Sequence, residues 1–428
     1  MSNPALASKY QILEISKNGR SFPLQSKVTS FDYYESLLSP NVTATMSFVD
    51  SGLVEDGDSQ VTYDKEYDKQ ERPGTIYNAL PITGFEEVRF KISSSLGVLD
   101  FSRTPLYVNG ASNPDQESNR ESVVLSLVSK PAITNQETHV KKNYSNHTNN
   151  TNIVESIAKN ILKLDKLQID ETSNKYPFIG NNKSPFDVIC MLASKSTPEK
   201  GNPGFLFYET RDGHSFKAID SLIDKEPVAT YFRNDANKSS VSDNSNDFKI
   251  NTFSVIKNQN LINALKSGVY SNRRVVFNPK TFKEEEIDFN LKSLEKALGK
   301  KEVTRPKDEK YTRVLYSVKD VGALSPSVKE TDDGDVNSYQ GSVQMRYNIL
   351  FSQIVKIQVP CNPNLKAGDI IKCNLEIITP GEKEQGSSDP VESGNYMILD
   401  LCHHYDTKRS FTAMTLVRDT YGLYTNKS

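Results

Sequence analysis

The sequence predicts a mainly β protein with α+β insertions, in which two tandem β-barrels are accompanied by smaller α/β domains. The first observation behind this prediction is the run from Ile354 to Arg418, which reads as four consecutive alternating strands. The second is that the chain up to about Val128 carries strand and loop signals but no helical periodicity. The third is that the two segments share an order of strand signals.

The C-terminal run is the clearest part of the pattern. Its first strand buries one face in Ile354–Val359, and Pro360 ends it because proline has no N–H for a ladder. After a turn with the sequence Lys366-Ala367-Gly368-Asp369, three more strands are expected: Ile371–Ile377, Tyr396–Tyr405 and Phe411–Arg418. Such a set predicts a meander that closes into a barrel or packs on another layer.

The N-terminal segment predicts about six strands and a small closed barrel, because closure removes exposed edges. Asn18-Gly19 marks a hairpin after the first strand, and Asn41–Phe48 alternates cleanly. The expected strands are Tyr10–Ile15, Asn41–Phe48, Phe85–Ile92, Val98–Phe101, Pro105–Val108 and Ser122–Val128. The polar loop Gly52–Gly74 is long, which indicates partner contact or mobility, or else a solvated loop without function.

The middle of the chain changes character. Ile153, Ile157, Ile161 and Leu164 form one helical stripe, and Ser184 caps a second helix with Pro185 in its first turn. A hairpin follows across Asp212-Gly213. Further on, the sequence predicts these features in order: a linker at Asn234–Asp247, a helix near Leu261–Leu265 ended by Gly268, a hairpin of Val269–Phe277 and Phe282–Phe289, a helical stretch at Leu291–Leu298, a charge run at Lys300–Lys310, a polar loop at Ser325–Asn337 and a helix at Ser342–Phe351.

These features predict five segments. Residues 1–129 form the first barrel and residues 130–225 an α+β middle domain. Residues 226–289 supply a linker, a short helix and a hairpin of the second barrel. Residues 290–350 are a helical and loop insertion, and residues 351–428 are the closing strands of the second barrel.

The two β segments resemble each other in the order of their signals, which is what two copies of one barrel would give. Asn41–Phe48 corresponds to Ile354–Val359 as an alternating strand. In both segments a glycine turn then precedes a strand with outward basic residues, and both end on Leu-Val and polar positions. The remaining equivalent stretches are Gly84 to Ile92 with Gly368 to Ile377, and Leu127-Val128 with Leu416-Val417.

Composition limits the classes of partner. The chain has 428 residues, 36% hydrophobic and 25% charged, and a net charge of −2, so no global basic field exists to bind nucleic acid or an anionic membrane. No apolar run approaches the roughly 20 residues of a membrane helix. The first residues carry no secretory signal. The four cysteines follow no paired spacing, which predicts reduced thiols made in a cytoplasm.

The search for chemistry predicts no catalytic, cofactor-binding or metal-binding residues, and therefore no enzyme and no cofactor. Cys402, His403 and His404 look like a metal cluster, but strand neighbours point to opposite faces, so Cys402 and His404 share one side. With Cys361 and Cys373 near, zinc is conceivable, although zinc ligands usually come in short-spaced pairs. His214 is expected to be solvated in its turn, and Glu284-Glu285-Glu286 to point outward. No nucleotide-binding, serine hydrolase or zinc protease motif occurs.

The C-terminal hundred residues resemble the closing barrel of phage tail hub proteins, a superfamily that includes the baseplate hub of contractile-tailed (T4-like) phages and the hub part of secretion-system spike proteins. Upstream, Gly204–Gly213 and Arg274–Pro279 resemble the middle region and a hairpin of such hubs, with Asn278 in place of the more familiar Asp. The C-terminal stretches that carry the resemblance are Ser352–Pro360, Leu365–Ile371, Tyr396–His404 and Phe411–Asp419.

The resemblance implies two tail-tube-like barrels in each chain and a homotrimer. Three chains would present six barrels, a pseudo-hexameric symmetry adapter in the virion tail baseplate between the tail tube protein and the central spike protein. It further implies contacts with baseplate wedge and tape-measure proteins, assembly in the host cytoplasm, and passage of DNA without sequence-specific binding or membrane insertion. Two other functions stay open from the sequence: a receptor-binding or adhesive tail component, and a tail-associated peptidoglycan hydrolase.

Overall fold

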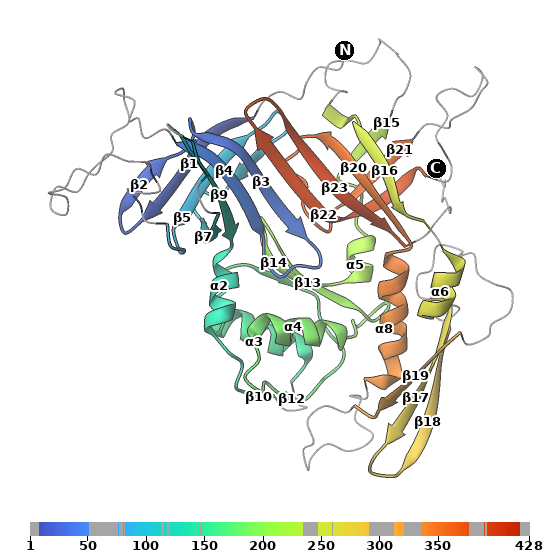
Figure 1. Cartoon of the computed structure of the whole chain (residues 1–428). Coiled ribbons are helices and arrows are strands. Elements are labelled where there is room, and N and C mark those ends of the chain that lie inside the picture. Colours follow the sequence, from blue (N-terminus) through green and yellow to red (C-terminus); the bar gives the residue numbers. More distant parts are fainter. Residues whose placement is uncertain are drawn as a thin grey trace, which may run out of the picture.

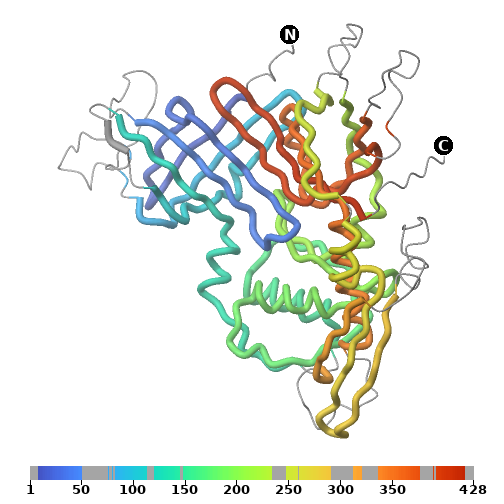
Figure 2. The backbone as a smooth tube through the Cα atoms, turned by 45° about the vertical axis from the view of Figure 1, so that its right-hand side comes forward, coloured from blue at the N-terminus to red at the C-terminus, as the bar shows by residue number. Residues whose placement is uncertain are grey.

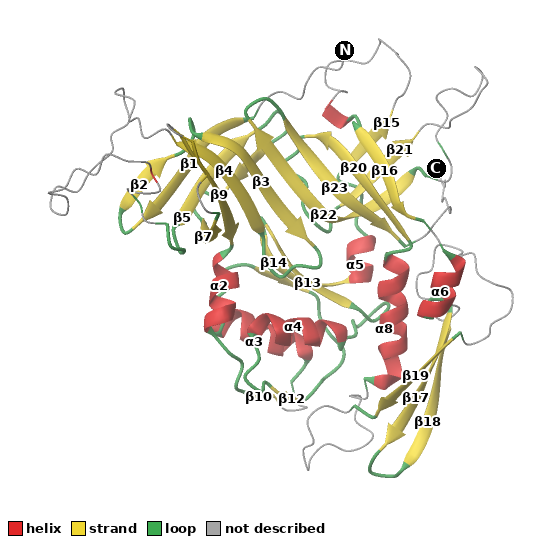
Figure 3. Cartoon of the chain, in the orientation of Figure 1, coloured by secondary structure: helices red, strands yellow, loops and turns green. Residues whose placement is uncertain are grey.

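A computed structural model describes residues 8–50, 76, 80, 82–112, 115–117, 120–144, 148–233, 247–258, 260–290, 312–320, 336–375, 389 and 392–419. Two curved β halves lie side by side, an α+β unit lies beneath them, and a long three-stranded arm extends from one end (Figure 1). The turned view in Figure 2 shows the same arrangement. Within the described residues the fold is mainly β with helical insertions, as predicted (Figure 3).

The two β halves belong to one 15-stranded sheet. The first half curls around a core that includes Phe31, Phe48 and Phe90. The hairpin predicted at Asn18-Gly19 is present, and both residues have positive φ. The strands of this half are β1 (Lys9–Lys17), β2 (Arg20–Pro23), β3 (Val28–Ser36), β4 (Thr43–Asp50), β5 (Glu87–Ser93), β6 (Val98–Asp100), β7 (Leu106–Ala111), β8 (Asp115–Glu117) and β9 (Arg120–Val128). The sequence analysis missed β2, β3 and β8.

The second half encloses a separate core that includes Tyr231, Ile357 and Leu416. An isolated bridge between Phe232 and Lys249 brings β15 back beside the chain that enters β16, so this half closes on itself. Its strands are β15 (Ala229–Arg233), β16 (Thr252–Lys257), β20 (Gln353–Pro360), β21 (Ile370–Leu375), β22 (Gly394–Asp406) and β23 (Ser410–Arg418).

The four predicted C-terminal strands exist, but they are not a simple meander. Their order is β21-β22-β23-β20, because β23 returns to pair with β20. Strand alternation predicts which face is buried and does not predict the ladder partner, so the sequence pattern could not distinguish the two arrangements.

The predicted repeat is confirmed by strand order. The first half has the order β3-β4-β9-β7-β5-β1, and the second half has β16-β20-β23-β22-β21-β15. The strands at equivalent positions in the two halves also follow one another in the same order along the chain. The three pairs matched in the sequence, β4 with β20, β5 with β21 and β9 with β23, are equivalent. One detail differs: β1 pairs antiparallel with β5, whereas β15 pairs parallel with β21.

The turns that enter β5 and β21 are built alike. The buried Glu86 carboxylate accepts a hydrogen bond from the N–H of Thr83 at 2.9 Å. In the turn before β21, Lys366 donates its N–H to the carboxylate of Asp369, three residues later, at 3.2 Å. The same local device therefore precedes the same strand in both halves.

A register shift also recurs at the equivalent place. The β7–β9 ladder shifts between Val108 and Gly110, and the β22–β23 ladder shifts between Ile398 and Asp400. An extra residue in one strand bends it and loosens its pairing beyond that point. We therefore treat the end of β7 and the end of β22 as equivalent segments.

The α+β unit packs two helices on a small sheet (Figure 3). Ser184 caps its helix as predicted by accepting from the N–H of Asp187 at 3.4 Å. The hairpin predicted across Asp212-Gly213 is present. The elements are α2 (Lys130–Glu137), β10 (Asn143–Tyr144), α3 (Asn150–Asn160), β11 (Leu167–Ile169), β12 (Phe178–Ile179), α4 (Pro185–Ser194), β13 (Phe205–Thr210), β14 (Gly213–Ala218) and α5 (Ile219–Ile223).

The arm corrects one prediction. The hairpin assigned to the second barrel, β17 (Ser271–Asn278) and β18 (Lys283–Asn290), instead forms a separate sheet with β19 (Arg313–Val318). The second barrel takes β15 and β16 in its place. Helix α6 (Leu261–Ser267) ends at Gly268 in the left-handed conformation, as predicted. Helix α8 (Asn337–Leu350) begins earlier than the expected Ser342.

Several predictions fall on residues outside the described part of the chain. These are the loop Gly52–Gly74, nearly all of the linker Asn234–Asp247, the helical stretch Leu291–Leu298, the charge run Lys300–Lys310 and most of the loop Ser325–Asn337. Among the helices that are described, none has the length and apolar character to cross a membrane.

Candidate functional site at the seam between the two β halves

The two halves are joined by the ladder between β3 and β22, which we call the seam. The first part of β22 pairs with β21, and the part after Leu399 pairs with β3, from Asp400 opposite Ser36 to Asp406 opposite Ser30. The partner changes at the register shift, where Leu37 donates its N–H to the Leu399 carbonyl at 2.9 Å. One long strand thus belongs to both halves.

The outer face of the seam is polar, and its strands contribute no lysine or arginine to it. His404 contacts the Asp32 carboxylate at 2.6 Å, and Ser36 donates its hydroxyl to Asp400 at 2.5 Å. Strands β3, β4 and β22 contain no basic residue other than histidine. The strands themselves therefore supply no fixed cation that could bind a phosphate backbone. Arg409, in the turn after β22, pairs with Asp406 at the end of the seam at 3.4 Å.

A buried carboxyl lies beneath the seam. Glu35 of β3 accepts hydrogen bonds from the N–H of Arg211 at 2.7 Å, the N–H of Ala367 at 2.9 Å and the Tyr33 hydroxyl at 2.9 Å. Burial raises the pKa of Glu35 to about 7, and the three donors only partly offset that effect. This side chain connects the first half, the α+β unit and the turn before β21.

A second buried carboxyl, Glu209 of β13, accepts from the Val42 N–H at 2.8 Å and the Ser129 hydroxyl at 2.6 Å. Burial raises its pKa to about 7, and the nearby Glu35 adds to the effect. His214 lies 3.6 Å away through Nδ1, while its Nε2 is 3.0 Å from the Pro40 carbonyl. Burial lowers the pKa of His214 to about 4, so the imidazole is neutral and this contact is not a salt bridge.

Arg346 of α8 is fully buried between the α+β unit and the end of β23. Its Nε donates to Asp220 at 2.7 Å, and its Nη1 lies 3.7 Å from the Asp419 carboxylate. The guanidinium joins three elements that are remote in the sequence.

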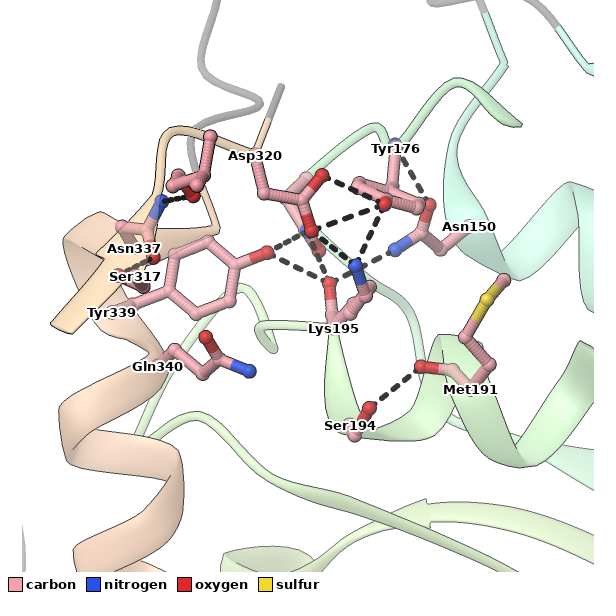
Figure 4. A network of polar contacts seen from close by, with 12 residues as sticks. Asn150, Tyr176, Met191, Ser194, Lys195, Ser317, Asp320, Asn337, Tyr339 and Gln340 are labelled. Carbon is pink, nitrogen blue, oxygen red and sulfur yellow. Dashed lines mark hydrogen bonds and ion pairs between the residues drawn. The ribbon is translucent and has the colours of Figure 1, made fainter. Parts of the chain in front are cut away.

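The arm is attached to the α+β unit by a second polar cluster (Figure 4). Tyr176 donates its hydroxyl to Asp320 at 2.9 Å, and Lys195 forms an ion pair with the same carboxylate. Tyr339 of α8 donates to the Lys195 carbonyl at 2.9 Å. Asp320 lies two residues after β19, whose last residue pairs with Phe277 beside the hairpin turn, so this cluster fixes the turn-side end of β19 to the α+β unit.

The residues that suggested a metal cluster do not meet. His403 is buried against Thr412, whereas Cys402 and His404 lie on the outer face, as the strand geometry predicted. Cys361 belongs to the core of the first half, and Cys373 to the core of the second. No group of three or more possible metal ligands occurs among the described residues.

Two predictions of solvent exposure had different outcomes: the one for His214 was wrong, and the one for the Glu284-Glu285-Glu286 run was confirmed. His214 was expected in solvent and is only 3% exposed, because β14 packs under the first half. The Glu284-Glu285-Glu286 run is exposed on β18, as expected. Sequence analysis missed Glu35, Glu209 and Arg346. A signal existed for Glu35, which shares its strand face with the apolar Phe31 and Tyr33.

The sheet also has unpaired edges. Within the described residues β16 pairs only with β20, and it exposes Val255 and Ile256. Beyond Val108, β7 pairs with β9 on one side, and no ladder partner is described on its other side.

No protein-family model matches the chain. A probable baseplate hub protein of Vibrio phage KVP40, gp334, is 21% identical over 366 residues, which cover 81% of this chain and 84% of that protein. The resemblance to phage tail hub proteins is thereby confirmed.

Solved structures of two tail proteins share the fold. The tail protein from Neisseria meningitidis MC58 gives a TM-score of 0.56 at 9% identity and covers 96% of this chain and 97% of its own. The 43 kDa tail protein of prophage MuSo2 from Shewanella oneidensis gives 0.53 at 10% identity, covering 96% and 98%.

Proposed function

We propose that this chain is the structural hub of a phage tail baseplate. In this proposal it forms a homotrimeric ring with pseudo-sixfold symmetry that joins the hexameric tail tube to the trimeric central spike and lets DNA pass. The sequence similarity to a probable baseplate hub protein and the tail-protein fold support this role. The virion tail baseplate is then its location, and its role is structural rather than enzymatic.

The single observation that carries the proposal is the duplicated strand order. Each chain offers two β halves with equivalent strands, turns and register shifts. Three copies around a threefold axis would therefore place six equivalent halves in a ring, which matches a sixfold tube on one face. The arm and the α+β unit occur once per chain, so the opposite face would have threefold symmetry and suit a trimeric spike.

The trimer is tested with the purified chain by native mass spectrometry and electron microscopy. We expect a mass of three chains and a ring with six lobes, which stacks on purified tail tube protein. A monomer or dimer at micromolar concentration would overturn the proposal. So would binding to host surface glycans without any ring, which would instead indicate an adhesin.

Passage of DNA is supported by the strands of the seam, whose outer face offers hydroxyls and carboxylates and to which β3, β4 and β22 contribute no lysine or arginine. We expect the Thr45→Lys, Thr415→Lys double variant to bind duplex DNA about tenfold or more tightly than the wild type at low salt, because each added cation releases a counterion. Both threonines are half-buried and lie on outer-face positions. Fluorescence anisotropy over a salt series measures the change.

The matched control replaces the same two threonines with glutamine, which has similar length and no charge. This variant should bind DNA as weakly as the wild type. Tight, strongly salt-dependent binding by the wild type itself would contradict a non-adhesive channel wall.

A further inference from the structure

The edge strand β16 exposes an apolar surface. Val255 is 38% exposed and Ile256 is 55% exposed, and β16 contains no proline and one charged residue, Lys257 at its end. An edge strand with free backbone groups and exposed apolar side chains pairs readily with another strand unless something covers it. This edge therefore has the properties of an interface.

The internal repeat identifies what covers such an edge. Strand β16 is equivalent to β3, because each pairs with the corresponding central strand, β20 or β4. In this alignment Val255, which lies opposite Val355, is equivalent to Tyr33, which lies opposite Ala44. Tyr33 is fully buried in the core of the first half, where His403 of β22 stacks against its ring with 6.1 Å between ring centroids. Val255 is exposed because no strand is described beside β16.

The repeat also identifies the partner segment. The part of β22 that covers β3 begins directly after the register shift at Leu399. The equivalent part of β7 begins after Asn109 and runs to Ser112, whose N–H bonds to Val124 of β9 at 2.8 Å. Its other side has no described ladder partner. The β16 and β7 edges lie toward opposite ends of the two β halves (Figure 1), so one chain cannot join its own two edges.

We infer that β16 of one copy pairs antiparallel with the Asn109–Ser112 segment of the next copy, and so repeats the β3–β22 seam between chains. The contact is head-to-tail, and three such contacts close a ring when the rotation matches a threefold axis. The inference rests on the trimeric hub proposed above and adds the surface through which the trimer forms. It places Lys257 of one copy opposite Ser112 of the next, as Tyr34 lies opposite Cys402 in the seam.

Crosslinking tests this register. The test uses a Cys190→Ser background, which removes the exposed native thiol. In this background the Lys257→Cys, Ser112→Cys variant should form disulfide-linked dimers and trimers on mild oxidation. The reason is that residues opposite each other on paired strands satisfy disulfide geometry. The control pair Lys257→Cys, Ser21→Cys places the second thiol on β2, outside the expected junction, and should stay uncrosslinked. Non-reducing electrophoresis and native mass spectrometry read the result.

A second variant tests the apolar edge. Ile256→Asp buries a carboxylate in the expected junction. The protein concentration at which half of the chains are trimeric should therefore rise at least about tenfold. Ile262→Asp makes the same change on α6, where the side chain is 63% exposed, and should assemble like the wild type. Circular dichroism checks that both variants fold.

The outcomes separate the two proposals. Trimers that assemble normally with Ile256→Asp and give no Lys257–Ser112 crosslink would overturn the strand pairing and leave the hub proposal standing. A wild-type chain that stays monomeric would instead overturn the hub proposal, and with it this junction.

Discussion

Replacing Arg346 with alanine should lower the free energy of unfolding by about 3–5 kcal/mol, because it leaves the Asp220 and Asp419 carboxylates without their buried cation. The Arg346 side chain is fully buried, and its Nε donates to Asp220 at 2.7 Å. Asp220 also accepts from the Asn202 N–H at 2.8 Å, which keeps its carboxylate partly satisfied. The loss of packing around α8 adds to the cost. Chemical denaturation of the whole chain measures the change.

The matched control is Arg409→Ala. Arg409 also faces a carboxylate, Asp406 at 3.4 Å, but its side chain is 67% exposed. Exposed ion pairs contribute about 0–1 kcal/mol, so this variant should unfold almost like the wild type. Equal effects of the two substitutions would mean that Arg346 does not hold the α8 junction together.

The second large effect concerns the buried carboxyl of Glu209. Burial raises its pKa to about 7 in the folded chain, above its ordinary value. The stabilisation that comes from its neutral form is complete below about pH 4.3 and is lost as the pH rises through 7. Glu209→Gln removes this titration. The free energy of unfolding of the variant, relative to the wild type, should therefore rise between pH 5 and pH 8 by on the order of 1–3 kcal/mol.

The geometry suits glutamine at this position. The amide oxygen can accept from Ser129 and Val42, and the amide N–H₂ can face Nδ1 of His214. Nε2 of His214 lies against the Pro40 carbonyl and carries the proton, so Nδ1 is free to accept.

The pH dependence must be read as a difference between variants. His214 and His403 are buried with pKa values lowered to about 4 and about 3, so their contribution has the opposite sign. It is present above about pH 6.5 and is lost as the pH falls toward those values. A Glu209→Gln variant whose stability tracks the wild type at every pH would show that Glu209 ionises normally.

Much of the fold follows from local patterns. The alternation in Asn41–Phe48 and Ile354–Val359 predicted β4 and β20, and the Ser184-Pro185 pair predicted the start of α4. The repeat was visible in the sequence because burial on one face and the glycine turn are both local features. Strand β3 escaped prediction because Glu35 places an acid on its buried face and Tyr34 places an aromatic ring on its outer face.

The candidate site was much less predictable. Glu35, Glu209 and Arg346 are polar residues whose burial depends on segments far away in the chain. The hairpin of β17 and β18 was assigned to the wrong sheet for the same reason, since its own pattern is compatible with either sheet.

By itself the sequence determined which stretches form strands, which faces they bury and that the β unit occurs twice, because side-chain periodicity records burial residue by residue. Only the tertiary structure decided that Ser36 lies opposite Asp400 in the seam and that, within the described residues, β16 forms a ladder with β20 alone. Every strand edge offers the same backbone donors and acceptors, so the choice of neighbour is made by the packing of whole units and not by the strand's own residues.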